Sequence, residues 1–399
     1  LRSFLPLTSS STSNASASLL LNSSSPGTLQ PSSYTTPVVD SLVSTSHTRT
    51  PSIPSNVSAR PTVMDHVVGR VFMLSKSQSG SRFVQENLSD PVYFDVFFNE
   101  LKTRVAELMM DNFGHYAIEA LMASCDDEQR LILVMNLTPG IGVVACHKQG
   151  SFSIQAMMDC LCSQTQIGFL SDALNNDVQR IILNCSGHYV ILRFLQRFGY
   201  PYTKFVHRAI VEYTVEFATD HYGLRVLKAV VDAGPVTHMR EVFSSLIKHT
   251  NTLVENQYGN YIIQHLLDVA PKPIAIQLKQ KMNGKFVRFS QQKFRSNVVE
   301  RCLRHSNREW RYTIIRQLMG AAGELISDKY GNYCLQTALQ VSDRQMTSEF
   351  IQAVHPHLNT LRENVKAKWK KILEASSKRQ ASSNQSSSTQ ALHSSHLHL

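Results

Sequence analysis

The stretches Asn256-Gln-Tyr-Gly-Asn-Tyr-Ile-Ile-Gln264 and Asp328-Lys-Tyr-Gly-Asn-Tyr-Cys-Leu-Gln336 are nearly identical, and weaker copies recur along the chain at a step of about 36 residues. One position of the copy, here called the marker, is Gly in every copy except the one that carries Arg295. The markers are Gly80, Gly114, Gly150, Gly187, Gly223, Gly259, Arg295 and Gly331. A period of this length is typical of a solenoid and not of a single globular core.

Three apolar columns keep the same period. Six residues before the markers stand Leu74, Leu108, Val144, Ile181, Phe217, Leu253, Phe289 and Leu325. Four residues after them stand Val84, Ile118, Ile154, Ile191, Leu227, Ile263, Val299 and Leu335, and four further on Leu88, Met122, Met158, Leu195, Val231, Leu267, Leu303 and Leu339. Because residues four apart lie on one face of a helix, each marker is expected to open a helix with a buried stripe. The sequence predicts an all-α curved stack of eight repeats.

Short polar side chains recur three residues before several markers. They are Asp111, Asn184, Asp220, Asn256 and Asp328, and each is expected to accept hydrogen bonds from free amides at a helix start. Gly at the marker is expected to let the backbone turn tightly and approach its neighbour.

Composition divides the 399 residues into three parts. Residues 1–64 are rich in Ser, Thr and Pro and are expected to form a disordered arm. Residues 65–374 hold the repeats and their caps, and residues 375–399 form a Ser/Gln/His-rich tail that is expected to be disordered. The formal net charge of +10 suits a polyanionic partner, either nucleic acid or an acidic membrane surface.

Several function classes find no support in the sequence. The seven cysteines lack the paired spacing of a zinc site and are expected to be buried, reduced thiols, so no metal or other cofactor is predicted. No apolar run approaching the roughly 20 residues of a membrane span is expected, and no membrane partner is predicted. Polar groups recur along the chain instead of converging on one pocket, as catalysis requires, so an enzyme is not expected.

Polar pairs stand beside the apolar stripe, one and five residues after each marker. They are Ser81 and Gln85, His115 and Glu119, Ser151 and Gln155, His188 and Leu192, Leu224 and Lys228, Asn260 and Gln264, Ser296 and Glu300, Asn332 and Gln336. Since residues i and i+4 project together, we expect the pairs to line one continuous surface.

Planar side chains dominate the ladder position, which is two residues after each marker. This position holds Arg82, Tyr116, Phe152, Tyr189, Arg225, Tyr261, Asn297 and Tyr333. Unstacked bases stack on aromatic rings and guanidinium planes at about 1–3 kcal/mol per base. A single triplet of this kind is usually ordinary helix surface, but eight in phase favour a site that holds single-stranded RNA, one base per repeat.

The chain here resembles the Pumilio (PUF) family of RNA-binding proteins. The resemblance is carried by Gly80-Ser-Arg-Phe-Val-Gln85, the two Tyr-Gly-Asn-Tyr-x-x-Gln stretches and Ser296-Asn-Val-Val-Glu300. It implies a right-handed curved α-solenoid of eight three-helix repeats with N- and C-terminal caps. It also implies pairs that contact base edges, ladder residues that stack on bases, and an RNA that runs antiparallel to the chain.

The pairs agree with the bases that the resemblance implies. The amides of Asn332 with Gln336 and of Asn260 with Gln264 match uracil, and the Glu300 carboxylate accepts both donors of guanine. Repeats eight, seven and six then read 5′-UGU. Ser81 with Gln85 and Ser151 with Gln155 suit adenine, which gives a predicted site 5′-UGUNNANA. His188 with Leu192, Leu224 with Lys228, and His115 with Glu119 depart from the family's usual sets, so repeats four, five and two are expected to be weakly selective.

The resemblance further implies regulation of mRNA translation or stability through 3′ untranslated regions, by a cytoplasmic and monomeric protein that recruits repressor or deadenylase partners. Two alternatives remain open. One is a protein-binding α-solenoid of the armadillo kind. The other is a nucleolar Pumilio-like protein that binds structured RNA in ribosome biogenesis, although such a protein is expected to lose the intact Asn-Tyr-Gln and Ser-Asn-Glu triplets. Lys285, Arg288, Arg301 and Arg304 are expected to neutralise phosphates, and Arg295 either reaches a phosphate or points to solvent.

Overall fold

The computed structural model of the chain describes residues 63–234 and 236–394. The chain divides into two units, Leu1–Arg60 and Pro61–Leu399, and the first lies wholly outside the described residues. The expected N-terminal arm therefore lies outside them too, apart from Val63 and Met64. His396 and His398 of the tail are also outside.

The second unit is built from repeats of three helices. The first helix of each is short: α2 (Val71–Ser75), α5 (Val105–Met109), α8 (Ile141–Cys146), α11 (Val178–Ile182), α14 (Thr214–Thr219), α17 (Thr250–Glu255), α20 (Phe286–Ser290) and α23 (Ala322–Leu325). The second carries the marker: α3 (Gln78–Asn87), α6 (Gly114–Ser124), α9 (Lys148–Cys160), α12 (Gly187–Arg197), α15 (His221–Ala233), α18 (Gly259–Val269), α21 (Arg295–His305) and α24 (Gly331–Val341).

The third helix of each repeat is a long one. These helices are α4 (Pro91–Leu101), α7 (Asp127–Leu137), α10 (Gln164–Asn176), α13 (Tyr200–Glu212), α16 (Arg240–Lys248), α19 (Lys272–Met282), α22 (Arg308–Gly320) and α25 (Arg344–Val354). Short 3-10 helices η1 (Thr138–Gly140), η2 (Val236–His238) and η3 (His355–Thr360) join some elements. The predicted all-α solenoid of eight three-helix repeats is confirmed.

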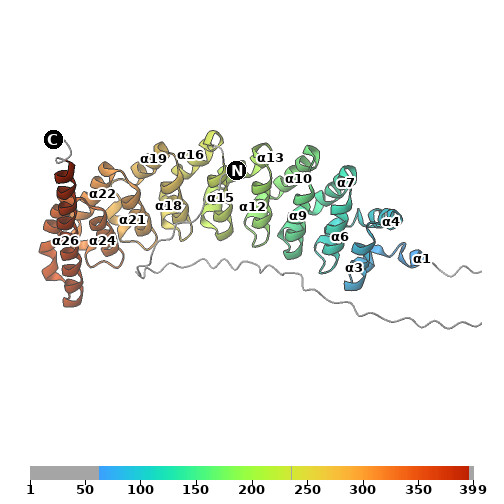
Figure 1. The fold of residues 1–399 in the computed structure, drawn as a ribbon, viewed down its shortest axis with the longest axis horizontal. Helices are drawn as coiled ribbons and strands as arrows, with labels where there is room; N and C mark the ends of the chain where they lie inside the picture. The colour runs from blue at the N-terminus through green and yellow to red at the C-terminus, as the bar shows by residue number, and fades with distance from the viewer. Residues whose placement is uncertain (1–62, 235, 395–399) are drawn as a thin grey trace, which may run out of the picture. The chain divides into compact units, whose positions relative to one another are not determined.

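The helices of this unit lie in rows. Figure 1 shows the marker helices α3 to α24 side by side along one edge and the long helices α4 to α22 along the other. Each marker helix packs on the marker helices of the repeats before and after it. Residues at the same position of successive repeats are therefore neighbours on one row.

The predicted apolar columns form the core of these repeats. All eight residues four positions after the markers, from Val84 to Leu335, have no exposed surface. In the other two columns, Leu74 and Leu195 are partly buried and pack on the core, and the remaining residues are buried. The spacing of apolar residues in the sequence therefore correctly predicts which face of each marker helix is buried.

Glycine markers are needed for close approach and not for an unusual backbone angle. A Cβ atom at Gly259 would lie 2.6 Å from the carbonyl oxygen of Leu253, and one at Gly150 would lie 2.3 Å from that of Val144. Among the described residues, only Gly69 and Gly284 have positive φ, and neither is a marker. The short helix of each repeat therefore sits directly against the start of the marker helix.

The polar residues before the markers satisfy the helix starts as expected. Oδ1 of Asp328 accepts hydrogen bonds from the amides of Tyr330 (2.9 Å) and Gly331 (2.6 Å). Asp111, Asn184, Asp220 and Asn256 accept the equivalent pairs of bonds. At Asp111, burial raises the pKa, but the hydrogen bonds from the Gly114 and Phe113 amides together with the nearby Lys76 outweigh it, so the pKa is lowered.

Helices α1 (Val63–Val67) and α26 (Glu363–Ser394) flank the repeats. Trp369 of α26 is 1% exposed, and its Nε1 donates a hydrogen bond to the carbonyl of Ile326 at 3.3 Å, so the helix closes the eighth repeat. α26 continues past residue 375, where the sequence led us to expect a disordered tail. No Gly or Pro follows Pro356, so no helix breaker interrupts it.

By length and mean hydropathy, the stretch of residues 127–146 reaches the level of a membrane span, so the expectation that no stretch approaches this length is wrong. In the structure this stretch is not one straight element, because η1 with Pro139 and Gly140 separates α7 from α8. Leu133, Leu137 and Val144 of the stretch are buried in the core of the repeats. Its hydropathy is explained by packing between helices.

The seven cysteines are all free thiols. Burial raises the pKa of Cys125, Cys302 and Cys334 to about 12, so these remain protonated at neutral pH. Cys162 and Cys185 are exposed, which corrects the expectation that the cysteines as a set are buried.

Candidate nucleic-acid interface

Large aromatic side chains are exposed to solvent along the row of marker helices. The five rings at the ladder position are between 46% and 57% exposed: Tyr116, Phe152, Tyr189, Tyr261 and Tyr333. Elsewhere in the described residues only Phe113 and Phe169 are aromatic side chains of comparable exposure. Large aromatic side chains that recur exposed along one row indicate a binding site, because water does not stabilise them.

The three remaining ladder residues differ from one another. Arg82 and Asn297 are exposed, as a contact with a ligand requires. Arg225 is half-buried and leans toward the fourth repeat, where its Nη1 donates a hydrogen bond to Tyr189 Oη at 3.3 Å and lies 3.5 Å from His188 Nε2. Arg225 therefore covers the edge of repeat four instead of standing free as a separate plane.

The two members of each polar pair lie at different depths. The first members are buried or half-buried at the helix start: Ser81, His115, Ser151, His188, Leu224, Asn260, Ser296 and Asn332. The second members are exposed or half-buried: Gln85, Glu119, Gln155, Leu192, Lys228, Gln264, Glu300 and Gln336. Within most pairs the second member is thus the more exposed of the two side chains.

In repeats six and eight the first amide holds the second. Nδ2 of Asn260 donates to the carbonyls of Asn256 (2.8 Å) and Gln257 (2.9 Å), while its Oδ1 accepts a bond from Gln264 Nε2 at 2.9 Å. Asn332 and Gln336 repeat this arrangement. The Gln side chain is thereby fixed with its carbonyl oxygen and one amide hydrogen left for a further partner.

The Ser-Gln pairs of repeats one and three are held in a similar way. Gln85 Nε2 donates to the Ser81 carbonyl (3.1 Å) and to Ser81 Oγ (3.2 Å). Ser81 Oγ donates to the carbonyl of Phe113 in the next repeat at 2.8 Å. Gln155 Nε2 donates to the Ser151 carbonyl at 3.0 Å.

Glu300 in repeat seven is fixed by side chains that the sequence did not single out for this role. Thr337 Oγ1, from the marker helix of repeat eight, donates to Glu300 Oε2 at 2.9 Å. Arg304 Nη2 lies 3.7 Å from the same oxygen and donates to Thr337 Oγ1 at 3.2 Å. Arg304 was expected to neutralise phosphates; in the structure it pairs with the carboxylate. No single-repeat pattern could reveal Thr337, because it acts across a repeat boundary.

The histidines at the first position pack against their own ladder residues. The ring centroid of His115 lies 3.8 Å from that of Tyr116, and that of His188 lies 3.9 Å from Tyr189. Burial lowers the pKa of His188, and Arg225 lowers it further, so this imidazole is neutral at physiological pH.

The pairs of repeats four and five each contain a leucine. Leu224 is 9% exposed and belongs to the core, and Leu192 of repeat four packs against the core. Both were named as candidate base-edge contacts, but neither has a side-chain polar atom with which to make a hydrogen bond. The middle of the row is therefore the part with the least capacity to distinguish one base from another.

Arg295 corrects both readings that the sequence left open. Its side chain is 8% exposed, pairs with Glu255 of repeat six, and has its guanidinium carbon 5.1 Å from the centroid of the Phe289 ring. It neither points to solvent nor stands free to contact a phosphate. Arg301 likewise pairs with Asp268, with Nε donating to Oδ1 at 2.7 Å.

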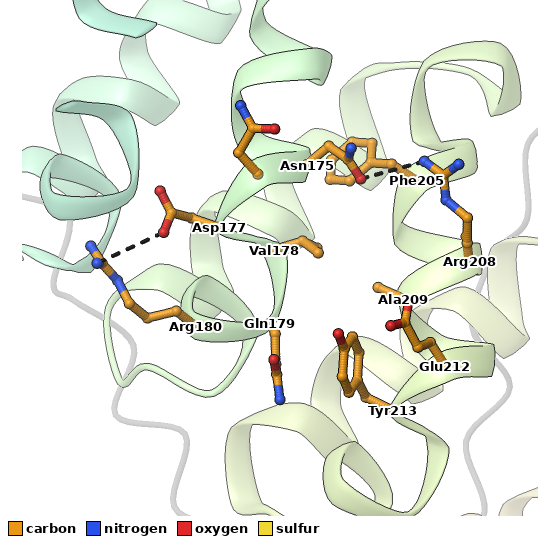
Figure 2. Close-up of a pocket in the computed structure, with 11 residues that line it drawn as sticks. Asn175, Asp177, Val178, Gln179, Arg180, Phe205, Arg208, Ala209, Glu212 and Tyr213 are labelled. Carbon is orange, nitrogen blue, oxygen red and sulfur yellow. Dashed lines mark hydrogen bonds and ion pairs between the residues drawn. The ribbon is translucent and has the colours of Figure 1, made fainter. Parts of the chain in front are cut away.

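A separate cavity of ≈ 330 Å³ lies at the ends of α10, α11 and α13. Figure 2 shows its polar lining, in which Arg180 pairs with Asp177 and Arg208 donates to Asn175. No ladder or pair residue lines it. In the described part of the chain, no group of three or more acidic, histidine or cysteine side chains is placed to hold a metal ion.

Comparison with known proteins gives the family to which these repeats correspond. The chain matches the family model described as the Pumilio-family RNA binding repeat at residues 70–88, 104–138, 141–174, 213–247, 249–278, 285–319 and 322–355. The matched segments leave out 175–212, which holds most of the fourth repeat.

Individual relatives agree with this match. The chain is 30% identical to "Pumilio homolog 12" of Arabidopsis thaliana over 80% of this chain and 55% of the relative, and 30% identical to "Putative pumilio homolog 7, chloroplastic" of the same plant over 75% and 47%. The chain thus spans about half the length of these curated relatives. In fold it is similar to a Puf4 RNA binding domain bound to an HO endonuclease RNA 3′ UTR recognition sequence, with a TM-score of 0.66, 24% identity, and 76% of this chain and 97% of that domain covered.

Proposed function

The chain belongs to the Pumilio family of RNA-binding repeat proteins, and from that premise we propose that it recognises single-stranded RNA elements with a 5′-UGU core in mRNA 3′ untranslated regions. Each repeat contacts one base, and the RNA runs antiparallel to the chain, so that repeat eight meets the 5′ base. The family is one of binding proteins and not of enzymes.

The observation that carries this proposal is the exposed row of rings at the ladder position. Five rings stand at the same position of the marker helices of repeats two, three, four, six and eight, and in four of these repeats the second member of the pair beside the ring is polar. Rings that stack on bases stabilise single-stranded RNA without regard to sequence, and the polar groups beside them supply the selection. A solenoid that binds proteins does not need planar side chains at the same position of its repeats.

Contacts within the pairs support the UGU assignment. Gln264 and Gln336 each present one acceptor and one donor from a fixed amide, which suits the N3–H donor and carbonyl acceptors of uracil. Glu300 presents a carboxylate whose Oε2 is held by Thr337, which suits the two N–H donors of guanine. Repeats eight, seven and six therefore select U, G and U.

Selection weakens toward the middle of the row. Leu192, Leu224 and the Arg225 contact with Tyr189 leave repeats four and five without a complete pair. Gln155 and Gln85 resume a polar readout in repeats three and one. The proposed site is 5′-UGUNNANA.

We further propose that the protein acts in the cytoplasm as a monomer, recruiting repressor or deadenylase partners to the mRNAs it binds. Fluorescent tagging of the full-length protein tests the location. Accumulation in chloroplasts, as the name of Arabidopsis pumilio homolog 7 states for that protein, or in the nucleolus would contradict a cytoplasmic role.

The test of the proposed function is a selection from randomised RNA, followed by Kd measurements with Glu300→Gln. The parent is expected to enrich UGU. The variant should lose about 1–3 kcal/mol of preference for guanine at the second base, because Gln cannot accept both donors of guanine. Glu309→Gln, on α22 of the same repeat, is the matched control and should bind like the parent.

Two outcomes would overturn the proposal. One is enrichment of RNAs without UGU. The other is equal affinity of the parent for UGU and UUU RNAs, in which case repeat seven does not read guanine.

A further inference from the structure

Two of the eight polar pairs end in a carboxylate, Glu300 in repeat seven and Glu119 in repeat two. The structure gives both the same kind of support. Ser153 Oγ, from the marker helix of repeat three, donates to Glu119 Oε1 at 2.5 Å, as Thr337 Oγ1 from repeat eight donates to Glu300 Oε2 at 2.9 Å. In both cases one carboxylate oxygen is tied to a hydroxyl of the next repeat.

Ser153 is completely buried, so it cannot itself touch a ligand on the exposed face. Its hydroxyl bond to a charged group is of the short and strong kind, and it restricts the rotation of the Glu119 side chain. The carboxylate of Glu119 is half-buried and is therefore presented in a fixed orientation beside Tyr116, which is exposed. Ser153 acts as a positioning residue.

A fixed carboxylate selects one base by its chemistry. It accepts hydrogen bonds and donates none, and it has room for about four of them on two oxygens. Guanine alone offers two adjacent donors, N1–H and N2–H, on its Watson–Crick edge. Uracil, cytosine and adenine each place an acceptor beside their single donor group, and that acceptor faces the negative charge.

The remaining surroundings of Glu119 do not reduce this capacity. Ala123 stands four residues after Glu119, where repeat seven has Arg304, so no equivalent of that guanidinium shares the carboxylate. His115 is held at the helix start by the bond between its Nδ1 and the Asp111 carbonyl (2.8 Å), and its ring lies against Tyr116.

We propose that repeat two selects guanine through Glu119, positioned by Ser153 of repeat three. This proposal rests on the proposed function and makes it more specific, since the weakly defined position next to the last becomes guanine and the site becomes 5′-UGUNNAGA. The second repeat then reads by the same chemistry as the seventh, although His115 replaces the serine that repeat seven carries.

The experiment is a selection with the full chain from RNAs that hold 5′-UGU fixed and randomise the nucleotides that follow. The parent should enrich guanine at one downstream position. Glu119→Gln should reduce guanine discrimination there by about tenfold, since one bidentate contact is lost. Comparing the two selections identifies the position read by repeat two without assuming a register.

Matched variants separate positioning from contact. Ser153→Ala should lower discrimination at the downstream guanine by about threefold, the effect of one hydrogen bond, and leave the UGU preference unchanged. Thr337→Val should do the reverse, lowering preference for guanine only within UGU. Thr337→Ser, which retains the hydroxyl, should behave like the parent.

The proposal for repeat two would be refuted if the parent did not enrich guanine downstream of UGU, or if Glu119→Gln enriched that guanine as strongly as the parent. In either case a retained preference for UGU would leave the proposed function intact. An equal loss of affinity for all RNAs in Ser153→Ala would show a structural role and would also count against the proposal. Loss of UGU enrichment in the parent would instead refute the proposed function itself.

Discussion

Each ladder ring keeps nearly half or more of its surface in water, although burial of an aromatic side chain is among the larger stabilising contributions in a protein. Tyr261 is such a ring, flanked by Asn260 and Gln264 of the same helix turn. Its neighbours in sequence, Ile262 and Ile263, are fully buried, so the helix could be anchored without it. The ring contributes to binding and little to folding.

Tyr261→Ala is therefore expected to weaken binding of UGU-containing RNA by about 1–3 kcal/mol through loss of base stacking. The melting temperature should change little. Fluorescence anisotropy with labelled RNA, together with thermal unfolding, measures both quantities. Phe169→Ala is the matched control, because this ring is also exposed but lies on α10, away from the marker helices.

A Tyr261→Ala protein with unchanged affinity, or one in which Phe169→Ala weakens binding equally, would show that the exposed rings do not stack on bases. A large fall in melting temperature would show that Tyr261 is needed for folding.

At the residue level, the sequence predicted the features that depend on a single repeat and missed the contacts between side chains of neighbouring repeats. Exposure of the rings and burial of the stripe both follow from helix period and needed no structure. Thr337, Ser153 and the Arg225 contact with Tyr189 act across repeat boundaries, over separations of about one period. Arg295 was missed for a related reason, because its partner Glu255 belongs to the preceding repeat.

At the level of the helix, the marker glycine sets how closely the short helix and the marker helix of one repeat approach. A Cβ at Gly259 would meet the Leu253 backbone, which cannot move without shifting α17. Arg295 occupies the marker position of repeat seven. The apolar residue six positions before it is Phe289, and the Arg295 guanidinium lies over the Phe289 ring. The marker position can therefore hold a side chain only where the short helix of the repeat leaves space for that side chain.

Gly259→Ala should lower the free energy of unfolding by about 1–3 kcal/mol, because the methyl group overpacks the contact between α17 and α18. Gly168→Ala is the control, since a Cβ at Gly168 in α10 meets no atom within 4 Å. That variant should be neutral or more stable by up to about 1 kcal/mol, as alanine is the better helix former. Denaturant unfolding compares the two directly, and equal effects would refute the close-approach argument.

Helix boundaries were harder to predict than helix faces. The sequence indicated a helix beginning at each marker, but α3, α9 and α15 begin two residues earlier. In these three helices the residue three before the marker has an extended backbone and caps the helix start with its side chain; these residues are Ser77, His147 and Asp220. Such two-residue differences depend on local capping geometry that composition does not specify.

At the scale of the whole solenoid, each repeat buries its surface only against its neighbours, so the ends need special residues. Trp369 of α26 covers the last repeat and bonds to the Ile326 carbonyl. The sequence predicted a cap within residues 65–374, and in the structure the buried indole of Trp369 makes the contact.

Trp369→Ala should destabilise the C-terminal end by about 3–5 kcal/mol, through loss of a fully buried aromatic side chain. Because coupling in a solenoid passes between neighbours, amides of repeats seven and eight should lose protection first and those of repeats one to four should change little. Hydrogen exchange with mass spectrometry resolves the repeats. Uniform loss of protection along the chain would contradict this expectation.

The hydroxyl that Ser153 offers to Glu119 has a consequence for engineering. If the second repeat is grafted into another scaffold without the third repeat, the Glu119 carboxylate is transferred without the hydroxyl of Ser153 that holds it. The transplantable module is thus a repeat together with the first turns of its successor, and recombined chains assembled at single-repeat joints should lose fidelity at every acidic reader so separated.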